Sequence, residues 1–557
     1  MQSIKIFCTL TIVFLMGCPG APDLTEHPDV TYTPAPVSTF WKSATVYFLL
    51  TDRFNNGNPN NDLQFERKPD GAVLRNFEGG DIAGITRKIE DGYFDSLGVD
   101  VIWFTPVFEQ IRSHTDEGTG KTYAYHGYWT RDWTALDPNF GTEEDLRRLV
   151  NTAHAHGIRI LLDAVINHTG PVTPVDTKWP DDWVRTDSTC RYQDYASTVE
   201  CMLVDNLPDI RTESTVPVNI PDFLQQKWTS ENRLEEEISE LDAFFNDTNY
   251  PHYPFYYIVK WLADWVKKLG IDGFRVDTAK HTEAYVWSVL KKECEKALNT
   301  WREEHTSASI HNDPFYMVGE VYNYGLSGGK EFDYGDQKVD FFSHGFESLI
   351  NFEFKYDAKS TYDSLFTKYS TLLNAPSFQN FSVLNYLASH DDGAPFDKER
   401  NKSYEAATKL LLSPGAVQIY YGDETARPLE IEGANGDANL RSMMNWDQLS
   451  DNEEIKSLHQ YWQKLGQFRR KHPAVGAGLH EVLSLSPYTF SRKLSDGDND
   501  RVIIGLDHPS GEKIVTVEGV FPDGTQIKDA YSGQTANVED GKIQINSTHS
   551  IVLLERM

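Results

Sequence analysis

Apolar runs separated by amphipathic segments dominate the chain from about residue 44 onward. Residues 44–54, 98–108 and 158–168 are short and almost continuously apolar, which is typical of buried parallel strands. Residues 142–157 start with Thr142, continue with an acidic turn and end in a glycine, a pattern that predicts a helix. The alternation of strands with helices predicts a parallel β/α fold.

This alternation stops over residues 169–253, which are rich in Pro, Asp and Thr and show clean periodicity only in a helical patch near 231–245. A stretch of this length indicates an inserted subdomain rather than a loop. Order returns with an amphipathic helix over 255–270, which leads directly into a strand over 273–281. Later strands are predicted over 315–322, 381–392 and 415–424.

The pattern of apolar and polar residues changes again after residue 473. Short alternating segments over 481–492, 500–508, 513–521 and 542–556 are separated by turn residues, which predicts a small antiparallel β-domain. We therefore predict an α/β fold, a (β/α)8 TIM barrel with an inserted subdomain after its third strand and a C-terminal antiparallel β-domain. Its predicted parts are a barrel over 44–168 and 254–473, an inserted domain over 169–253 and a β-domain over 474–557.

The first residues of the chain are typical of a targeting signal rather than of a folded domain. Residues 1–18 hold one lysine and an apolar run too short to span a bilayer, and they end in Leu-Met-Gly-Cys. That ending resembles a bacterial lipoprotein signal with Cys18 as the lipidated residue; the alternative is an ordinary secretory signal cleaved slightly later. Residues 19–43 then predict a Pro-rich tether. We expect an exported protein, periplasmic or at the cell surface, anchored to a membrane by lipid.

The net charge of −31, from 52 basic and 83 acidic residues, disfavours nucleic acid and anionic membrane surfaces as partners. A neutral substrate or bound cations are compatible with it, and we expect a monomer. Cys190 and Cys201 bracket a short polar segment, which in an exported protein predicts a disulfide. Cys294 lies in a helical pattern and is predicted to be a buried free thiol.

Polar residues stand at the ends of the predicted strands, where a (β/α)8 barrel places its active site. Arg275 and Asp277 share one face of an apolar strand, although a buried ion costs several kcal/mol unless it is paired. Glu320 and the pair His390-Asp391 end later strands. Any one of them could be a cap or a satisfied core group, but together they indicate a site. Two carboxylates across a glycosidic bond are the usual equipment for hydrolysing it.

Four segments identify a family. "DAVINH", "GFRVDTAKH", "GEVY" and "ASHDD" resemble, in order and spacing, the best-known regions of the α-amylase family, glycoside hydrolase family 13. The resemblance covers roughly residues 44–480 and is strongest to the bacterial periplasmic members. It implies that Asp277 is the nucleophile, Glu320 the acid/base and Asp391 a third carboxylate that binds sugar hydroxyls. It further implies that substrate is contacted by Tyr128, His168, Arg275, Lys280, His281 and His390.

The resemblance also implies calcium. Asn167, Asp209 and the backbone carbonyl of His281 match the ligands of a site that links the barrel to the insertion. Two segments resemble a second calcium loop, the alternative being an Asn/Gly-rich turn without metal. Its ligands would be Asn56, Asn58, Asn61, Asp62, Gly79 and Asp81. No chloride is expected, because Ser389 replaces the Asn that chloride-activated members carry.

Three functions are compatible with this reading. The first is retaining endo-hydrolysis of α-1,4-glucosidic bonds in starch and maltooligosaccharides. The second is transglycosylation or action on cyclodextrins on the same scaffold, which the catalytic residues do not distinguish. The third is a non-catalytic glucan-binding lipoprotein, which the three retained carboxylates disfavour.

Overall fold

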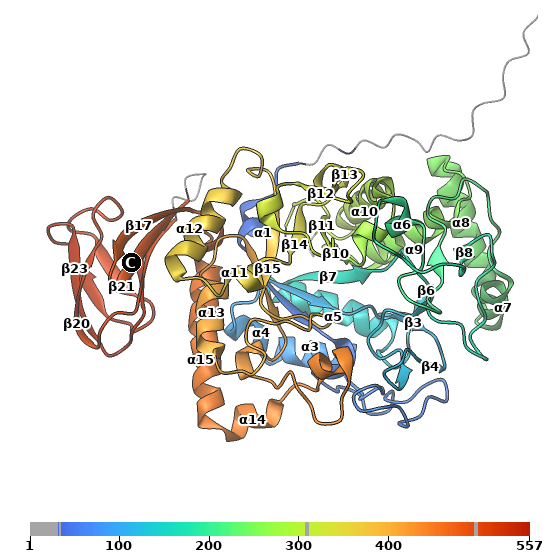
Figure 1. Cartoon of the computed structure of the whole chain (residues 1–557), viewed down its shortest axis with the longest axis horizontal. Coiled ribbons are helices and arrows are strands. Elements are labelled where there is room, and N and C mark those ends of the chain that lie inside the picture. The colour runs from blue at the N-terminus through green and yellow to red at the C-terminus, as the bar shows by residue number, and fades with distance from the viewer. Residues whose placement is uncertain (1–31, 33–34, 307–310, 495–499) are drawn as a thin grey trace, which may run out of the picture.

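A closed barrel of eight parallel strands forms the centre of the molecule (Figure 1). The computed structural model describes residue 32 and residues 35–306, 311–494 and 500–557. The predicted barrel is confirmed. Its strands are β1 (Thr45–Leu49), β2 (Val101–Phe104), β7 (Arg159–Ala164), β10 (Gly273–Val276), β11 (Tyr316–Gly319), β14 (Ser348–Asn351), β15 (Ser382–Tyr386) and β16 (Ala416–Tyr420).

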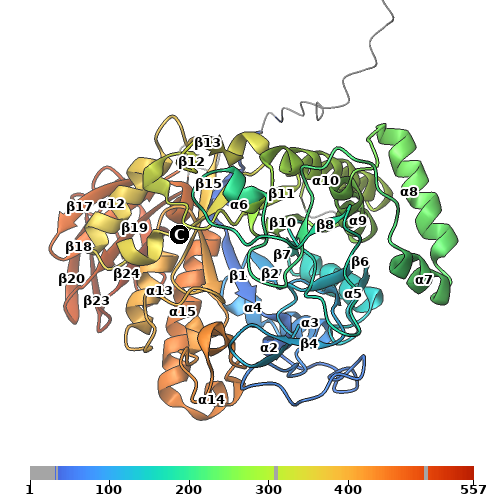
Figure 2. The same cartoon turned by 45° about the vertical axis from the view of Figure 1, so that its right-hand side comes forward.

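These strands are buried on both faces, which is why most of them appear in the sequence as apolar runs. Helices cover the barrel from outside (Figure 2). Two of these helices follow the predicted signals. α5 (Glu143–Ala155) begins at the cap Thr142, whose hydroxyl accepts a hydrogen bond from the Asp145 N–H. α9 (Pro254–Leu269) begins at a proline and ends at a glycine in the left-handed region, and it packs against α10 (Ala284–Glu304).

Further helices complete the layer around the barrel. They are α2 (Thr51–Phe54), α3 (Ile82–Glu90), α4 (Tyr93–Ser96), α11 (Phe354–Asp357), α12 (Tyr362–Leu373), α13 (Ser403–Leu411), α14 (Trp446–Asp451), α15 (Glu453–Lys471) and α16 (Ala474–Ala477). No helix within the described ranges is long and apolar enough to cross a membrane.

Two excursions interrupt the alternation. The predicted one, between β7 and β10, holds β8 (Val184–Arg185), α6 (Ala196–Val199), β9 (Asp209–Ile210), α7 (Asp222–Ser230) and α8 (Leu234–Thr248). The other, between β2 and α5, holds two small antiparallel strand pairs that the sequence pattern did not reveal, one of them inserted between the strands of the other. Their strands are β3 (Phe108–Gln110) with β6 (Thr130–Leu136), and β4 (His114–Asp116) with β5 (Lys121–Tyr123).

The C-terminal β-domain lies at the opposite end of the molecule from α7 and α8 (Figure 1). A six-stranded antiparallel sheet and a separate two-stranded antiparallel sheet enclose an apolar core of their own. The larger sheet runs in the order β17 (Leu479–Leu485), β18 (Tyr488–Lys493), β19 (Arg501–Leu506), β24 (Val552–Arg556), β21 (Gln526–Asp529) and β22 (Thr535–Asn537). The smaller sheet pairs β20 (Gly511–Thr516) with β23 (Lys542–Ser547).

The predicted tether over 19–43 is wrong at its C-terminal end. Residues Thr39–Ser43 form the helix α1, and Trp41 is only 2% exposed. Its ring stacks on Tyr316 of the barrel strand β11, with 3.8 Å between ring centroids. The Val37 N–H donates to the Asn380 carbonyl. This segment belongs to the folded body because its apolar side chains find partners there. Residues 19–31 and 33–34 of the predicted tether lie outside the described residues, as does the predicted signal with Cys18.

We expect Trp41→Ala to lower the free energy of unfolding by about 3–5 kcal/mol, the usual cost of deleting a fully buried tryptophan. Denaturant titration followed by circular dichroism measures the change. Trp41→Phe, which retains an aromatic ring for the stack on Tyr316, should lose clearly less. A loss below about 1 kcal/mol for the alanine variant would restore the tether reading.

Candidate active site

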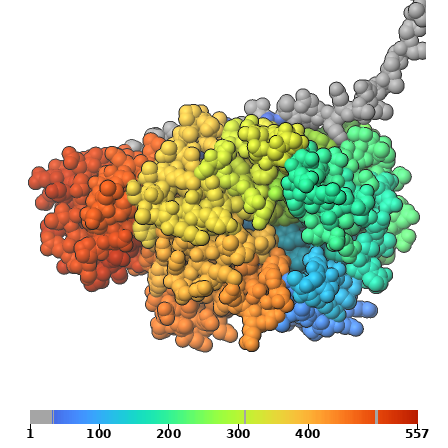
Figure 3. Space-filling model, in the orientation of Figure 1, coloured from blue at the N-terminus to red at the C-terminus, as the bar shows by residue number. Residues whose placement is uncertain are grey.

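A cavity of about 650 Å³ opens at the carboxyl ends of the barrel strands. Figure 3 shows a hollow at its mouth, where the green segment of the insertion meets the light-blue and orange segments. The cavity gathers predicted residues that are far apart in sequence. Those that line it are Tyr128, His168, Asp277, Lys280, His281, Glu320, His390 and Asp391.

Arg275 lies beneath this cavity and joins three carboxylates. It is 1% exposed, and its Nη1 lies 2.6 Å from Asp277 Oδ1 and 2.9 Å from Asp163 Oδ1. Its Nη2 lies 2.9 Å from Glu320 Oε2. The charges on the apolar strand are therefore paired, as burial requires. One guanidinium fixes the relative positions of both predicted catalytic groups.

Glu320 follows β11 and is held from two sides. Besides Arg275, the Thr278 N–H donates to Glu320 Oε2 at 2.8 Å. Thr278 has a φ of 48°, a left-handed conformation that is uncommon for a non-glycine residue. Burial raises the pKa of Glu320 to about 8, against the opposing effect of Arg275 and with the support of the Asp277 charge. The carboxyl is thus protonated at neutral pH, as an acid catalyst must be.

This pKa sets the alkaline limit of activity. Because the acid form donates the proton, kcat/KM should be constant below about pH 8 on this limb and should fall tenfold per pH unit above it. Initial rates on a soluble maltooligosaccharide from pH 6 to 10 measure the profile. A rate that stays constant to pH 10 would exclude Glu320 as the group that must be protonated.

Asp163 orients the floor of the site. It is fully buried on β7, beside Arg275 in the strand register, and it accepts hydrogen bonds from Trp103 Nε1 at 3.1 Å and from Tyr128 Oη at 2.9 Å. Burial raises its pKa to about 6, against the opposing effect of Arg275. No role was assigned to Asp163 from the sequence. Its contacts hold both Arg275 and the Tyr128 ring.

The site histidines are neutral at physiological pH. Burial lowers the pKa of His168 and His390, and it lowers that of His281 to about 4. The His390 ring stacks beside Tyr128 at 5.3 Å, and His168 Nε2 lies 3.1 Å from the Tyr128 carbonyl oxygen. A neutral imidazole offers both a donor and an acceptor, which suits sugar hydroxyls.

Asp391 follows β15 and reaches the cavity with 38% of its side chain exposed. Burial between the walls of the cavity raises the pKa of Asp391 above its usual value. Behind it, Arg441 Nε donates to the His390 carbonyl at 2.9 Å and Arg441 Nη1 pairs with Asp437 at 2.7 Å. Sequence reasoning missed this pair, whose one signal was the spacing of opposite charges four residues apart.

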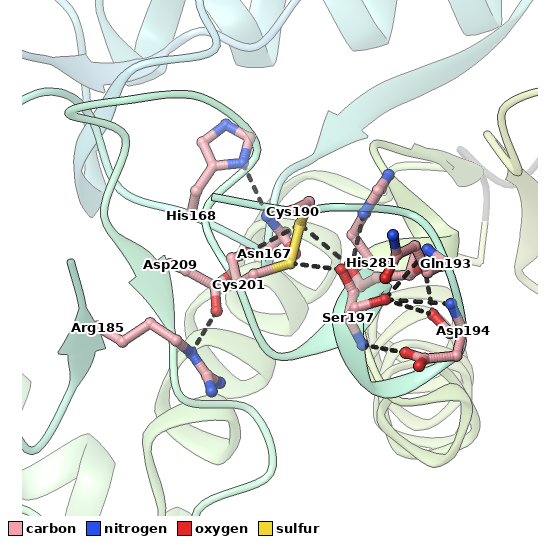
Figure 4. Close-up of a disulfide and its surroundings, with 11 residues drawn as sticks. Asn167, His168, Arg185, Cys190, Gln193, Asp194, Ser197, Cys201, Asp209 and His281 are labelled. Carbon is pink, nitrogen blue, oxygen red and sulfur yellow. Dashed lines mark hydrogen bonds and ion pairs between the residues drawn. A yellow bond between two sulfur atoms is a disulfide. The ribbon is translucent and has the colours of Figure 1, made fainter. Parts of the chain in front are cut away.

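Asn167 and Asp209 lie side by side between barrel and insertion (Figure 4). Their segments are joined because the Ile210 N–H donates to the Asn167 carbonyl at 2.8 Å. Asn167 Oδ1 and Asp209 Oδ1 are buried and find no hydrogen-bond partner among the described residues. Buried oxygens without partners fit a calcium ion, although Arg185 Nε already pairs with Asp209 Oδ2 at 2.7 Å. Within the described ranges no group of three or more His, Cys, Asp or Glu side chains is placed to hold a metal ion, so a calcium ion here would depend on amide and backbone carbonyl oxygens as well.

The residues of the second predicted calcium loop are also close together. Asn56 Nδ2 donates to Asp62 Oδ1 at 2.9 Å, and a side chain at Gly79 would collide with both residues. Asn56 Oδ1 and Asn61 Oδ1 are buried without a partner in the described part of the chain, which fits a cation. Asp81 already caps α3 by accepting the Gly84 N–H. The Asn58 side chain accepts from the Asn60 N–H at 3.2 Å, so the donor set is weaker than the first.

Cys190 and Cys201 form a disulfide, as predicted, next to His281 (Figure 4). Cys294 is free and buried within α10, also as predicted.

Comparison with known proteins agrees with this geometry. The family model for the α-amylase catalytic domain matches residues 48–473. The periplasmic α-amylase of Escherichia coli is 37% identical over 531 residues, which cover 85% of this chain and 73% of that protein. A cyclomaltodextrin glucanotransferase of Geobacillus stearothermophilus is 27% identical, and the aligned region covers 91% of this chain and 65% of that protein. A solved Geobacillus thermoleovorans α-amylase in complex with acarbose has the same fold, with a TM-score of 0.63, 21% identity and coverage of 92% of this chain and 99% of that one. The chain therefore belongs to the α-amylase family, glycoside hydrolase family 13, and is a glycoside hydrolase.

Proposed function

We propose that the protein is an exported α-amylase that cleaves α-1,4-glucosidic bonds within starch and maltooligosaccharides and retains the anomeric configuration. The observation that carries the proposal is the single guanidinium of Arg275, which holds Asp277 and Glu320 toward one cavity. The similarity to the Escherichia coli periplasmic α-amylase supports this activity and supports export.

In this mechanism Asp277 attacks the anomeric carbon while Glu320 protonates the leaving oxygen. The raised pKa of Glu320 supplies that proton at neutral pH. Glu320 then removes a proton from water, which releases the sugar from Asp277. Asp391 binds hydroxyls of the same glucose, and the Tyr128 ring packs beneath it. The neutral His168 and His390 complete the hydrogen bonds to that glucose.

We further propose that calcium holds the insertion on the barrel through Asn167, Asp209 and the His281 carbonyl. The unpartnered Asn167 and Asp209 oxygens support this assignment. Calcium at a second site, held by Asn56, Asn61 and Asp62, has weaker support. Residues 1–18 are proposed as a lipoprotein signal with Cys18 as the anchor, the protein is proposed to be a monomer, and no chloride site is proposed because Ser389 stands beside His390.

Removal of calcium should therefore destabilise the protein. A ligand present at a hundred times its Kd stabilises the folded state by about 2.7 kcal/mol, so EDTA should lower Tm by several degrees. Asp209→Asn should lose most of this difference. Differential scanning fluorimetry with EDTA and with excess calcium makes the measurement. Identical Tm values for the wild type in both conditions would contradict the calcium assignment.

Transglycosylation is the second candidate. The similarity to cyclomaltodextrin glucanotransferases favours it, because a sugar can replace water in releasing the intermediate from Asp277. Glucan binding without catalysis is disfavoured, because Asp277, Glu320 and Asp391 all line one cavity.

Digestion of soluble starch and maltoheptaose by the wild type and by Glu320→Gln, followed by proton NMR, tests the proposal. We expect linear maltooligosaccharides that are released as α-anomers by the wild type alone. Larger or cyclic products would favour the transferase, and β-anomers would overturn retention.

A further inference from the structure

The Cys190–Cys201 disulfide closes a short loop beside His281 (Figure 4). The bridge spans a sequence separation of only 11 residues. Tyr192, within this loop, lines the cavity with 53% of its surface exposed. An exposed aromatic ring in a sugar-binding cavity offers a flat apolar face to which a pyranose can pack.

The loop contacts Lys280 and His281, which lie three and four residues after Asp277. The Tyr192 ring meets the His281 ring edge-on at 5.4 Å, and Lys280 Nζ lies 5.4 Å from the centre of the Tyr192 ring. His281 Nδ1 lies 2.9 Å from the Thr198 carbonyl oxygen of the same loop. The position of Tyr192 is therefore tied to Lys280 and His281.

A hairpin of β12 (Glu331–Asp333) and β13 (Lys338–Asp340) holds the loop from the other side. The Tyr195 N–H donates to Asp336 Oδ1 at 2.9 Å, and the rings of Tyr195 and Tyr334 pack edge-on at 5.0 Å. Tyr334 Oη in turn donates to the Lys280 carbonyl at 2.8 Å. Loop, hairpin and Lys280 thus form one continuous wall.

Tyr192 itself has a φ of 54°, in the left-handed region that a non-glycine residue adopts at a cost. Such a conformation persists where the surrounding structure constrains it. The short disulfide loop supplies that constraint, because both ends of the segment are tied together.

This wall lies on the side of the departing sugar. Glu320 delivers its proton to the leaving oxygen, so the leaving group stands next to Glu320. Lys280 Nζ donates to the carbonyl of Tyr322, two residues beyond Glu320, at 3.3 Å. Tyr192 lies against the same Lys280.

We propose that the disulfide holds Tyr192 as a platform for the leaving-group sugars, so that a dithiol which reduces the bridge weakens their binding and spares the bond-breaking carboxylates. The inference rests on the proposed function and specifies one side of that site. In the reduction, one thiolate of the dithiol attacks a bridge sulfur and releases the other cysteine as a thiolate. The second thiol of the reductant resolves the mixed disulfide; the protein gains two thiols and the dithiol becomes a disulfide.

Two substrates separate this role from a general structural one. Maltoheptaose needs sugars on both sides of the cleaved bond, whereas α-maltosyl fluoride has a leaving group that occupies no sugar site. We expect Tyr192→Ala to lower the ratio of kcat/KM for maltoheptaose to that for α-maltosyl fluoride by about tenfold, the order expected for one lost aromatic contact. Tyr192→Phe should recover most of the ratio, because the ring remains.

Dithiothreitol should lower the same ratio in the wild type, and the double variant Cys190→Ser/Cys201→Ser should start low and not respond to the reductant. Tyr404→Ala is the matched control, since Tyr404 is 45% exposed on α13, away from the cavity. An unchanged ratio, or parallel loss of both substrates, would overturn the inference while leaving the proposed function intact. No turnover of either substrate by the oxidised wild type would overturn the proposed function and this inference with it.

Discussion

Asp277→Ala is expected to reduce kcat on maltoheptaose by about 10⁴-fold or more, the largest effect of any substitution considered. The carboxylate that forms the covalent intermediate is removed, while Glu320, Asp391 and the cavity remain. Steady-state kinetics with reducing-sugar detection measures the loss. Substrate binding by calorimetry should persist, because the walls of the cavity are unchanged.

Azide distinguishes a missing nucleophile from a damaged site. The alanine leaves room beside Arg275 for a small anion, so azide should restore turnover of α-maltosyl fluoride and yield a β-glycosyl azide. NMR of the product identifies the anomer. Failure of azide rescue together with retained substrate binding would argue against Asp277 as the nucleophile.

Arg275→Met is expected to have the second largest effect. Removing this side chain leaves the buried Asp163, Asp277 and Glu320 without their common cation, and breaking a buried ion pair costs about 3–5 kcal/mol of stability. Without the guanidinium the pKa values of Asp163 and Glu320 rise further above their unfolded values. The loss of stability should therefore be greater at pH 8, where the folded wild type carries Asp163 and part of Glu320 as carboxylates paired with Arg275, than at pH 5, where both carboxyls are mostly protonated in the folded wild type.

Denaturant titration at the two pH values tests this sign. Arg469→Met provides a matched control, because Arg469 is equally buried but donates to the carbonyls of Ser43, Leu411 and Ser413. Its loss should depend less on pH. If Arg275→Met were equally destabilised at both pH values, the three-carboxylate account would be wrong.

The barrel could be predicted because its strands are buried on both faces and therefore appear as apolar runs. Strand β14 was not predicted, because Ser348 and Asn351 make half of this short strand polar and it therefore does not appear as an apolar run. Arg275 and Asp277 were detectable because charge on an apolar strand is costly and needs an explanation. The fold explains it with Asp163 and Glu320, from the two neighbouring strands β7 and β11.

What the sequence could not supply was contact across long separations. Trp41 resembled part of a tether because its partner, Tyr316, lies far along the chain on β11. Arg441 and Asp437 carry no local pattern that places them behind His390. Tyr192 also has no local pattern that indicates its position, because that position depends on contacts with Lys280 and His281 from another part of the chain.

Mass spectrometry of the trapped intermediate tests the central claim most directly. α-Maltosyl fluoride can load the nucleophile without an acid catalyst, and Glu320→Gln lacks the base that activates water for release. We expect this variant, quenched in acid after brief exposure, to gain the mass of one maltosyl unit on the peptide that contains Asp277. Absence of an adduct while fluoride is still released, or an adduct on another carboxylate, would contradict the covalent mechanism on Asp277.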